Sequence, residues 1–253
     1  MTSHQNILAV ASGKGGVGKT WLTVTLAHAA TKAGRRVIVL DGDIGLANID
    51  IQLGMAPTRD LSLWAAGKAD LASLAQPTPA GFDLIPGASG SGVMAGIGGA
   101  EIARLVGEFA NLAASYDFGM IDISAGVEPA QIRLAGAARR CLLVITEDPT
   151  SLTDGYAFVK VAQRLKRPPT FEVVVNMAES ADSGAKAYAA LSRACKSFLD
   201  VQPKLLGVVR RDPAVAAAIR RQTPLLETAR GAAAASDVNA ILAAALPSPA
   251  RAA

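Results

Sequence analysis

Short apolar runs alternate with longer stretches of helical character along the whole chain. Seven runs bounded by Gly, Pro, Asp or Asn predict buried strands at Ile7 to Ala11, Val37 to Leu40, Phe82 to Ile85, Phe118 to Ile123, Cys141 to Thr146, Phe171 to Val175 and Leu205 to Val209. Helices are predicted at Thr20 to Ala33, Glu101 to Tyr116, Pro129 to Ala138, Leu152 to Leu165, Gly184 to Leu199 and Pro213 to Arg221. This alternation is typical of βαβ units. We therefore expect one α/β domain with a mostly parallel, twisted sheet of about seven strands and helices on both faces.

Three segments qualify this picture. Asp212 before Pro213 is a favourable helix start, and Ser236 to Leu246 carries apolar residues at helical spacing, so we expect a last docking helix and a frayed tail at 247–253, after a domain at 1–246. Gly87 to Gly99 contains six glycines in thirteen residues and predicts a mobile loop. A second phosphate loop is not expected there, because no lysine follows.

Composition narrows the class of protein. Hydrophobic residues make up 51% and charged residues 18%, which excludes a disordered or fibrous chain. No apolar run approaches the roughly 18 residues of a spanning helix and no signal peptide precedes Ile7, so we expect a soluble, cytoplasmic protein. Cys141 and Cys195 lack paired spacing, which argues against a disulfide or zinc site. The net charge of +4 favours anionic partners such as nucleotide, nucleic acid or acidic lipid.

The first strand leads directly into a phosphate-binding motif. Gly13 to Thr20 reads GKGGVGKT and satisfies G-x-x-x-x-G-K-[ST] between a strand and a helix. The glycines allow backbone N–H groups to surround phosphate oxygens, and the helix N-terminus adds a favourable potential. Lys19 is expected to reach the β and γ phosphates, and the Thr20 hydroxyl to bind Mg²⁺. The sequence therefore predicts a P-loop nucleoside triphosphatase.

Lys14 is surplus to an ordinary phosphate loop. The run KGGVGKT from Lys14 to Thr20 resembles the signature K-G-G-x-G-K-[ST] of the deviant Walker A, or MinD/ParA, ATPase family. That resemblance implies that ATP, ADP and Mg²⁺ are the ligands, and that Lys14 crosses the interface of an ATP-dependent sandwich homodimer to the partner's nucleotide. It assigns catalysis to Lys14, Lys19 and Asp43, and a cofactor-binding segment to Gly13, Gly15, Gly16, Val17, Gly18, Lys19, Thr20 and Trp21.

Acidic residues end two further strands, where ligands bind in open α/β sheets. Asp41 and Asp43, two apart on an extended strand, are expected to point the same way; an ordinary turn role remains open, more so for Asp41. By resemblance, Asp43 positions the attacking water and lies at the metal, with Asn48 as a switch residue near it. Asp122 ends the fourth strand, and Gly126 follows four residues later.

The fourth strand has the character of a Walker B segment. Asp122 is therefore expected to hold Mg²⁺ together with Thr20, and the Gly126 amide to sense the γ phosphate. Ile123 departs from the family, which usually has a small or hydroxyl residue there. For the base, Asn176 matches an adenine-contacting asparagine, and the turn containing Arg210, Asp212 and Pro213 matches a segment that closes over adenine. A turn role for Asn176 stays open.

Three stretches point to one branch of the family. DGDIGLANIDIQLG, DPTSLTDGYAFVK and VVVNMAESADSGAKAYAAL, with the later DPAVAAAIRRQTPLLE, resemble the flagellar-number and placement ATPases of the FlhG, or FleN, branch. The second stretch is expected to begin a helix capped by Ser151 or Asp154. A flagellar assembly or regulatory protein is the partner that this resemblance implies. Only six residues stand before the first strand, where the branch commonly has a glutamine-rich helix that activates a GTPase, so direct activation is not expected.

Two other partners are weighed against this interpretation. Arg210, Arg211, Arg220 and Arg221 bracket one short helix, and a ParA-like ATPase that binds nonspecific DNA is the alternative function. A solvated helix face explains the same arginines. The last predicted helix lacks the cations that membrane-surface helices need, so peripheral association with the membrane or cell pole has no support from this segment.

Overall fold

The computed structural model describes residues 6–43, 47–88 and 98–245. The expected tail at 247–253 lies outside these ranges, as do residues 89–97 of the glycine-rich segment and residues 44–46 after Asp43. The mobility predicted for the glycine-rich segment and the domain boundary at residue 246 therefore stay predictions. Gly99, placed in that segment by its composition, instead opens a helix.

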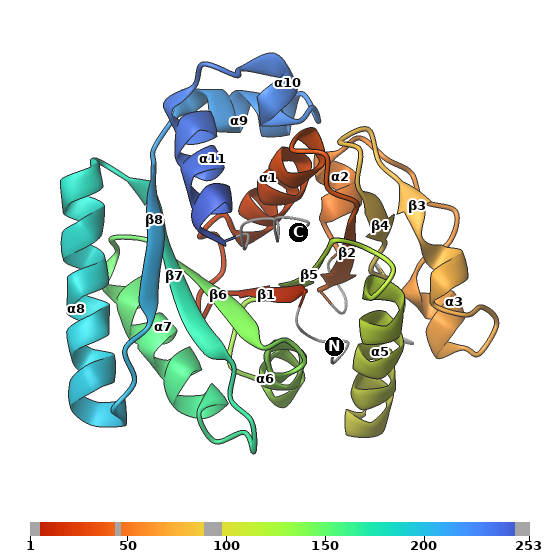
Figure 1. The fold of residues 1–253 in the computed structure, drawn as a ribbon, viewed down its shortest axis with the longest axis horizontal. Helices are drawn as coiled ribbons and strands as arrows, with labels where there is room; N and C mark the ends of the chain where they lie inside the picture. Colours follow the sequence, from red (N-terminus) through yellow and green to blue (C-terminus); the bar gives the residue numbers. More distant parts are fainter. Residues whose placement is uncertain (1–5, 44–46, 89–97, 246–253) are drawn as a thin grey trace, which may run out of the picture.

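Among the described residues, one sheet holds all the strands, in the order β3-β4-β2-β5-β1-β6-β7-β8 (Figure 1). They are β1 (Ile7–Ala11), β2 (Val37–Gly42), β3 (Gln76–Pro77), β4 (Asp83–Ile85), β5 (Phe118–Ile123), β6 (Arg140–Ile145), β7 (Thr170–Ala178) and β8 (Lys204–Arg210). Every pairing is parallel except that of β3 with β4. The seven predicted strands are confirmed, and the two-residue β3 is an addition at the edge.

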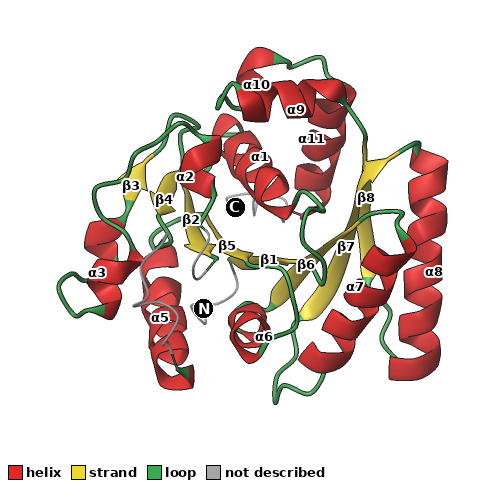
Figure 2. Cartoon of the chain, turned by 180° about the vertical axis from the view of Figure 1, so that it is seen from behind, coloured by secondary structure: helices red, strands yellow, loops and turns green. Residues whose placement is uncertain are grey.

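Helices cover both faces of the sheet, as Figure 2 shows from behind. They are α1 (Lys19–Lys32), α2 (Ile49–Gln52), α3 (Leu61–Ala65), the 3₁₀ helix η1 (Ala72–Leu74), α5 (Gly99–Ala113), α6 (Pro129–Gly136), α7 (Pro149–Ala162), α8 (Ala181–Leu199), α9 (Pro213–Arg220), α10 (Leu225–Thr228) and α11 (Ala233–Ala245). One core contains α3 and α5 to α8, and the other contains α1, α10 and α11. The expected α/β architecture is confirmed.

The starts of α7 and α9 share one capping device. Asp212 accepts a hydrogen bond from the Ala214 amide, with Pro213 in the first turn, as the sequence predicts. The same device begins α7, where Asp148 caps the helix and Pro149 follows. Capping by Ser151 or Asp154 is therefore wrong, because the helix starts three residues earlier than its apolar pattern indicates.

The last described helix buries the side that its spacing predicts. Val238, Ile241, Leu242 and Ala245 of α11 are all buried, so this segment docks on the core. No helix within the described ranges is long and apolar enough to cross a membrane. The two cysteines are buried and free.

The strand order decides where a ligand can bind. β1 lies between β5 and β6, and the chain forms one half of the sheet on the β5 side and the other on the β6 side. A reversal of this kind leaves a crevice at the carboxyl ends of the central strands. The segments that follow β1, β2, β5 and β6 therefore meet at one edge, and they contain the phosphate loop and the acidic strand ends.

Candidate nucleotide site

The phosphate loop turns sharply between β1 and α1. Gly16 and Gly18 have φ values of 77° and 82°, a left-handed conformation that glycine adopts without strain. The first hydrogen bond within α1 runs from the Leu22 amide to the Gly18 carbonyl, at 3.0 Å. The amides of Lys19, Thr20 and Trp21 precede that bond. They are thus the groups that a helix N-terminus offers to an anion.

A buried polar cluster lies beneath the loop. The Lys19 Nζ is 2.9 Å from Asp122 Oδ1, and these side chains are only 7% and 1% exposed. The Thr20 hydroxyl donates to Asp122 Oδ2 at 2.8 Å, and the Thr23 hydroxyl donates to Asp122 Oδ1 at 2.9 Å. The structure thus brings together the lysine, hydroxyl and carboxylate that the sequence predicts. Thr23 is an addition that only its position one turn after Lys19 could have suggested.

This cluster fits a magnesium ion. A hydroxyl oxygen and a carboxylate oxygen, already 2.8 Å apart in Thr20 and Asp122, are of the type that Mg²⁺ prefers. Within the described ranges, no group of three or more His, Cys, Asp or Glu side chains gathers into a metal site. The donor set therefore suits an ion shared with phosphate oxygens and water.

Asp41 joins the end of β2 to the start of α2. It lies beside Asp122 in the register of β2 and β5, and its carboxylate accepts hydrogen bonds from the amides of Asp43, Asn48 and Ile49, each at 3.1 Å. Burial, and then the charge of Asp122, raise the pKa of Asp41 to about 7. Asp41 thus has a structural role, since its carboxylate connects the backbone on both sides of residues 44–46.

Asp43 lies just beyond the strand. We expected Asp41 and Asp43 to point the same way because side chains two apart on a strand lie on the same face. Since β2 ends at Gly42, that reasoning does not extend to Asp43. Asp43 is half-buried, and the Asn48 side chain is exposed. The catalytic and metal roles of Asp43, and the switch role of Asn48, stay predictions.

Gly126 links the end of β5 to the phosphate loop. Its amide donates to the Ser12 carbonyl at 3.0 Å, and its φ of 121° favours glycine. The Ser12 hydroxyl donates in turn to the Lys14 carbonyl at 2.9 Å. The amide predicted to sense the γ phosphate is therefore engaged by a backbone carbonyl next to the phosphate loop, and its sensing role stays a prediction.

Lys14 contacts two residues that sequence reasoning missed. Its Nζ is 2.7 Å from Asp148 Oδ2 and also donates to the Thr150 hydroxyl. The lysine and aspartate side chains are 36% and 47% exposed. These contacts and the Asp148 helix cap lower the pKa of Asp148 to about 2, with the hydrogen bond from Lys14 as the largest cause. The pair Asp148-Pro149, which follows a predicted strand, was the sequence feature that could have indicated a helix cap near the phosphate loop.

A cavity of about 250 Å³ adjoins this side of the loop. Its lining includes Lys14, Gly15, Gly16 and Val17 from the loop, with Glu147 and Asp148 after β6, and Met177 and Arg211. Across the loop, the buried Asn176 amide donates to the Val17 carbonyl at 2.8 Å. The Asn176 side chain also occupies the space beside Gly18, where an added Cβ would be 2.3 Å from its Nδ2. Asn176 therefore helps to fix the loop, whatever its part in base binding.

The segment predicted to close over adenine is engaged within the chain. Arg210 contacts Asp237 through its amide, at 3.0 Å, and through its guanidinium, at 2.9 and 2.7 Å. Asp212 and Pro213 begin α9. The roles of Arg210, Asp212 and Pro213 toward adenine stay predictions. Because Arg210 forms an ion pair with Asp237, it is a weaker candidate for binding DNA phosphates in the alternative function.

Trp21 contributes its side chain to the core. It is buried, and it lines a small cavity together with residues of α9 and α10. A role of Trp21 in nucleotide binding through its backbone amide stays a prediction. Gly13, at the other end of the motif, passes so close to α7 that an added Cβ would lie 2.1 Å from the Asp154 carbonyl oxygen.

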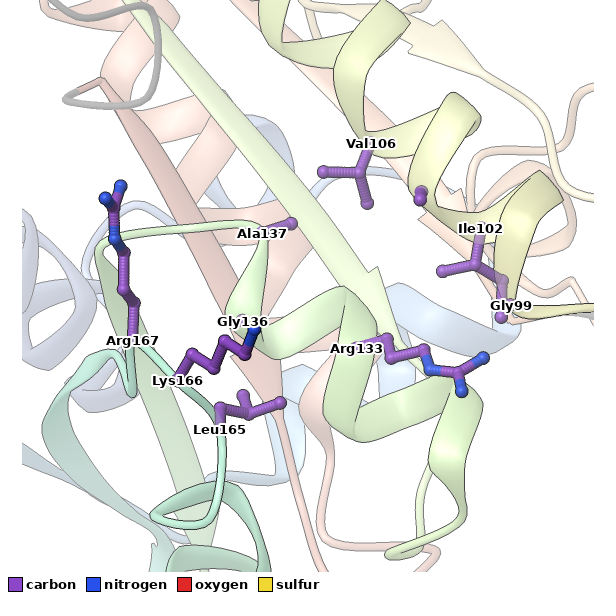
Figure 3. Close-up of a pocket in the computed structure, with 10 residues that line it drawn as sticks. Gly99, Ile102, Val106, Arg133, Gly136, Ala137, Leu165, Lys166 and Arg167 are labelled. Carbon is purple, nitrogen blue, oxygen red and sulfur yellow. The ribbon is translucent and has the colours of Figure 1, made fainter.

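A larger cavity, of about 570 Å³, lies elsewhere on the molecule. Figure 3 shows it with Ile102 and Val106 of α5 on one side, and Arg133, Lys166 and Arg167 on the other. None of the predicted site residues lines it. Several of the predicted site residues line the smaller cavity at the phosphate loop instead, so that cavity is the candidate nucleotide site.

Comparisons with known proteins find relatives that match most of the chain. Residues 8–225 match the family model described as the CobQ/CobB/MinD/ParA nucleotide binding domain. The chain is 37% identical to the antiactivator FleN of Pseudomonas aeruginosa over 221 residues, which cover 87% of this chain and 79% of FleN. It is 31% identical to the flagellum site-determining protein YlxH of Helicobacter pylori, over 77% of this chain and 65% of YlxH.

A solved structure shares the fold. The septum site-determining protein MinD of Pyrococcus horikoshii, complexed with Mg-ADP, superposes with a TM-score of 0.79 at 22% identity. The match covers 94% of each chain. The arrangement predicted from the phosphate-loop motif and from the alternation of strands and helices is therefore confirmed at the level of the fold.

Proposed function

Because this chain belongs to the CobQ/CobB/MinD/ParA nucleotide-binding family, we propose that it is a Mg²⁺-dependent ATPase acting as a dimerising switch that controls the number or placement of flagella. The observation that carries the proposal is the buried Lys19, Thr20 and Asp122 cluster beneath a glycine-rich loop. It combines a cation for phosphate with oxygen ligands for Mg²⁺.

Hydrolysis on this scaffold depends on positioning and charge compensation. The loop amides and Lys19 bind the phosphates, while Thr20 and Asp122 would hold Mg²⁺, which supplies further compensation of phosphate charge when bound. Asp43 orients the attacking water. Lys14 of a second copy reaches the same phosphates, so that the complete site needs two chains. ATP and its hydrolysis thus control whether the dimer exists.

The flagellar role is supported by similarity along most of the chain. The relatives FleN and YlxH, the latter named as a flagellum site-determining protein, match 87% and 77% of it. The stretches resembling the flagellar branch include the segment from Asp148 to Lys160, which contains the cap and most of α7 and contacts Lys14 through Asp148. A flagellar assembly or regulatory protein is the partner, and the cytoplasm the place of action.

A purified-protein experiment tests the switch. Phosphate release and the molar mass in solution are measured with ATP, with ADP and with EDTA. The unaltered chain should hydrolyse ATP slowly and dimerise only with ATP. Lys19→Ala should lose both properties, whereas Asp43→Ala should keep ATP-dependent dimerisation and stop hydrolysis. Hydrolysis by Asp43→Ala at the unaltered rate would refute the role of Asp43.

Counting flagella tests the cellular role. In a strain of the source organism that lacks this gene, electron microscopy should show an altered number or position of flagella. The unaltered chain should restore the normal arrangement and Lys19→Ala should not. Normal flagella in the deletion strain would refute the flagellar assignment and leave the ATPase assignment to the first experiment.

A further inference from the structure

Lys14 is held within its own chain by two side chains from the start of α7. Asp148 Oδ2 is 2.7 Å from its Nζ, and the Thr150 hydroxyl accepts a second hydrogen bond from the same nitrogen. The contacts join residues more than 130 positions apart in the sequence, from the phosphate loop to the segment after β6. The lysine predicted to act on a partner's nucleotide is thus occupied in the single chain.

Asp148 performs two tasks with its two carboxylate oxygens. Oδ1 accepts hydrogen bonds from the Thr150 amide and hydroxyl, both at 2.9 Å, and these bonds cap α7 and orient the threonine. Oδ2 remains for the lysine. The Thr150 hydroxyl therefore donates to Asp148 and accepts from Lys14. This small network presents one negative charge and one acceptor to a single ammonium group.

We propose that Asp148 and Thr150 are positioning residues that retain Lys14 in its own chain and thereby oppose ATP-dependent dimerisation. The inference rests on the proposed dimerising switch. For Lys14 to enter the partner's site, both contacts must first break. The nucleotide-free chain is therefore stabilised as a monomer, and ATP has to outcompete an internal carboxylate for the lysine.

The size of the restraint follows from its exposure. Ion pairs that are partly open to solvent contribute a small free energy, which corresponds to about a two- to five-fold change in an equilibrium constant. Such a restraint shifts the ATP concentration needed for dimerisation without preventing the dimer. That magnitude suits a switch, since a strong clamp would block assembly altogether.

The chain contains a matched control. At the start of α3, Asp60 Oδ1 accepts hydrogen bonds from the Ser62 amide at 2.8 Å and from its hydroxyl at 2.5 Å, which repeats the cap formed by Asp148 and Thr150. No ion pair to Asp60 occurs within the described ranges. Asp60→Asn therefore makes the same chemical change in the same type of cap without touching Lys14.

Amine labelling tests the restraint without nucleotide. Acetylation of lysines by an activated ester is followed by mass spectrometry, with exposed Lys160 as the internal reference. Lys14 should be acetylated about two- to five-fold faster, relative to Lys160, in Asp148→Asn and in Thr150→Ala than in the unaltered chain. Asp60→Asn should leave the ratio unchanged. An unchanged ratio in both α7 variants would overturn the proposal.

Dimerisation measures the consequence. Molar mass against ATP concentration should show half-maximal dimer at about two- to five-fold lower ATP for Asp148→Asn and for Thr150→Ala. Thr150→Ala changes no charge, so its effect separates loss of the restraint from weaker repulsion of ATP. If the unaltered chain never dimerises with ATP, the proposed switch fails. If it dimerises and the α7 variants need as much ATP or more, only the restraint fails.

Discussion

The buried pair formed by Lys19 and Asp122 provides the sharpest test of the site. Asp122→Asn keeps the shape of the side chain but leaves the Lys19 ammonium, 7% exposed, without its counter-charge. Lys19→Met leaves Asp122 next to Asp41, its register neighbour on β2, so that two buried carboxylates face each other. Both single changes should destabilise the nucleotide-free chain, and Lys19→Met should do so more.

The magnitude follows from the burial of both charges. Removing one partner of a buried ion pair typically costs about 3–5 kcal/mol, because the other charge stays buried and uncompensated. For a domain of this size that corresponds to a fall in melting temperature of roughly 6–20 °C. The double variant Lys19→Met/Asp122→Asn removes both charges and should recover about 2 kcal/mol relative to the sum of the single changes.

Urea unfolding in EDTA and without nucleotide measures all three variants. Additive effects, with a coupling free energy below about 0.5 kcal/mol, would refute the reasoning, since the pair would then contribute no more than a solvent-exposed one. ADP binding in EDTA is a second measurement. Asp122→Asn releases Lys19 from its internal anion, so this variant should bind ADP more tightly than the unaltered chain.

The pH dependence should change in the same variant. The pKa of Asp41 is raised from its ordinary value of 3.8 to about 7, first by burial and then by Asp122. The folded chain therefore holds a proton that the unfolded chain lacks between these values, and this contribution to stability falls as the pH rises through that window. In Asp122→Asn one of the two causes is removed, so the fall, which still begins near pH 3.8, should end at a lower pH and be smaller.

Further predictions concern the loop and the core. Gly13→Ala should weaken nucleotide binding measured by calorimetry, because its Cβ would lie 2.1 Å from the Asp154 carbonyl oxygen and the loop must shift. Asn176→Ala should lower the free energy of unfolding in urea by about 1–3 kcal/mol, since the buried Val17 carbonyl loses its donor. Burial lowers the pKa of His28, so its neutral form is favoured on folding and stability is lost as the pH falls below about 6.5. His28→Gln should reduce that loss in urea titrations at several pH values, and an unaltered slope would contradict the assignment.

The sheet was predictable because parallel strands buried on both faces are uniformly apolar. β1 and β5 have the predicted bounds, and every residue in each is buried. The elements missed are short: β3 is a Gln-Pro pair, and α2 and α10 contain four residues each. Too few residues repeat in such elements to produce a period, so their conformation depends on the surfaces against which they pack.

In the candidate site, too, the local features could be predicted from the sequence and the long-range contacts could not. The loop from Gly13 to Thr20 could be predicted whole, because its conformation and chemistry lie in one contiguous segment. The partners of its lysines could not, since Lys19 and Asp122 meet only because β1 pairs with β5, and Lys14 and Asp148 meet only because β1 also pairs with β6. Composition and spacing do not encode that strand order.

The internal partners change the meaning of the net charge. Lys14 and Lys19 are the two lysines of the phosphate loop motif, and each already contacts a carboxylate of its own chain. Under the proposed function, ATP would exchange one anionic partner for another at both lysines, and the gain in free energy would be the difference between the two interactions. The amides of Lys19, Thr20 and Trp21, in the first turn of α1, have no carbonyl acceptor within that helix. We therefore expect the affinity for nucleotide to depend on the conformation of the phosphate loop. Asp122 and Asp148 should regulate that affinity, because any change that breaks their ion pairs with the two lysines favours the nucleotide-bound state.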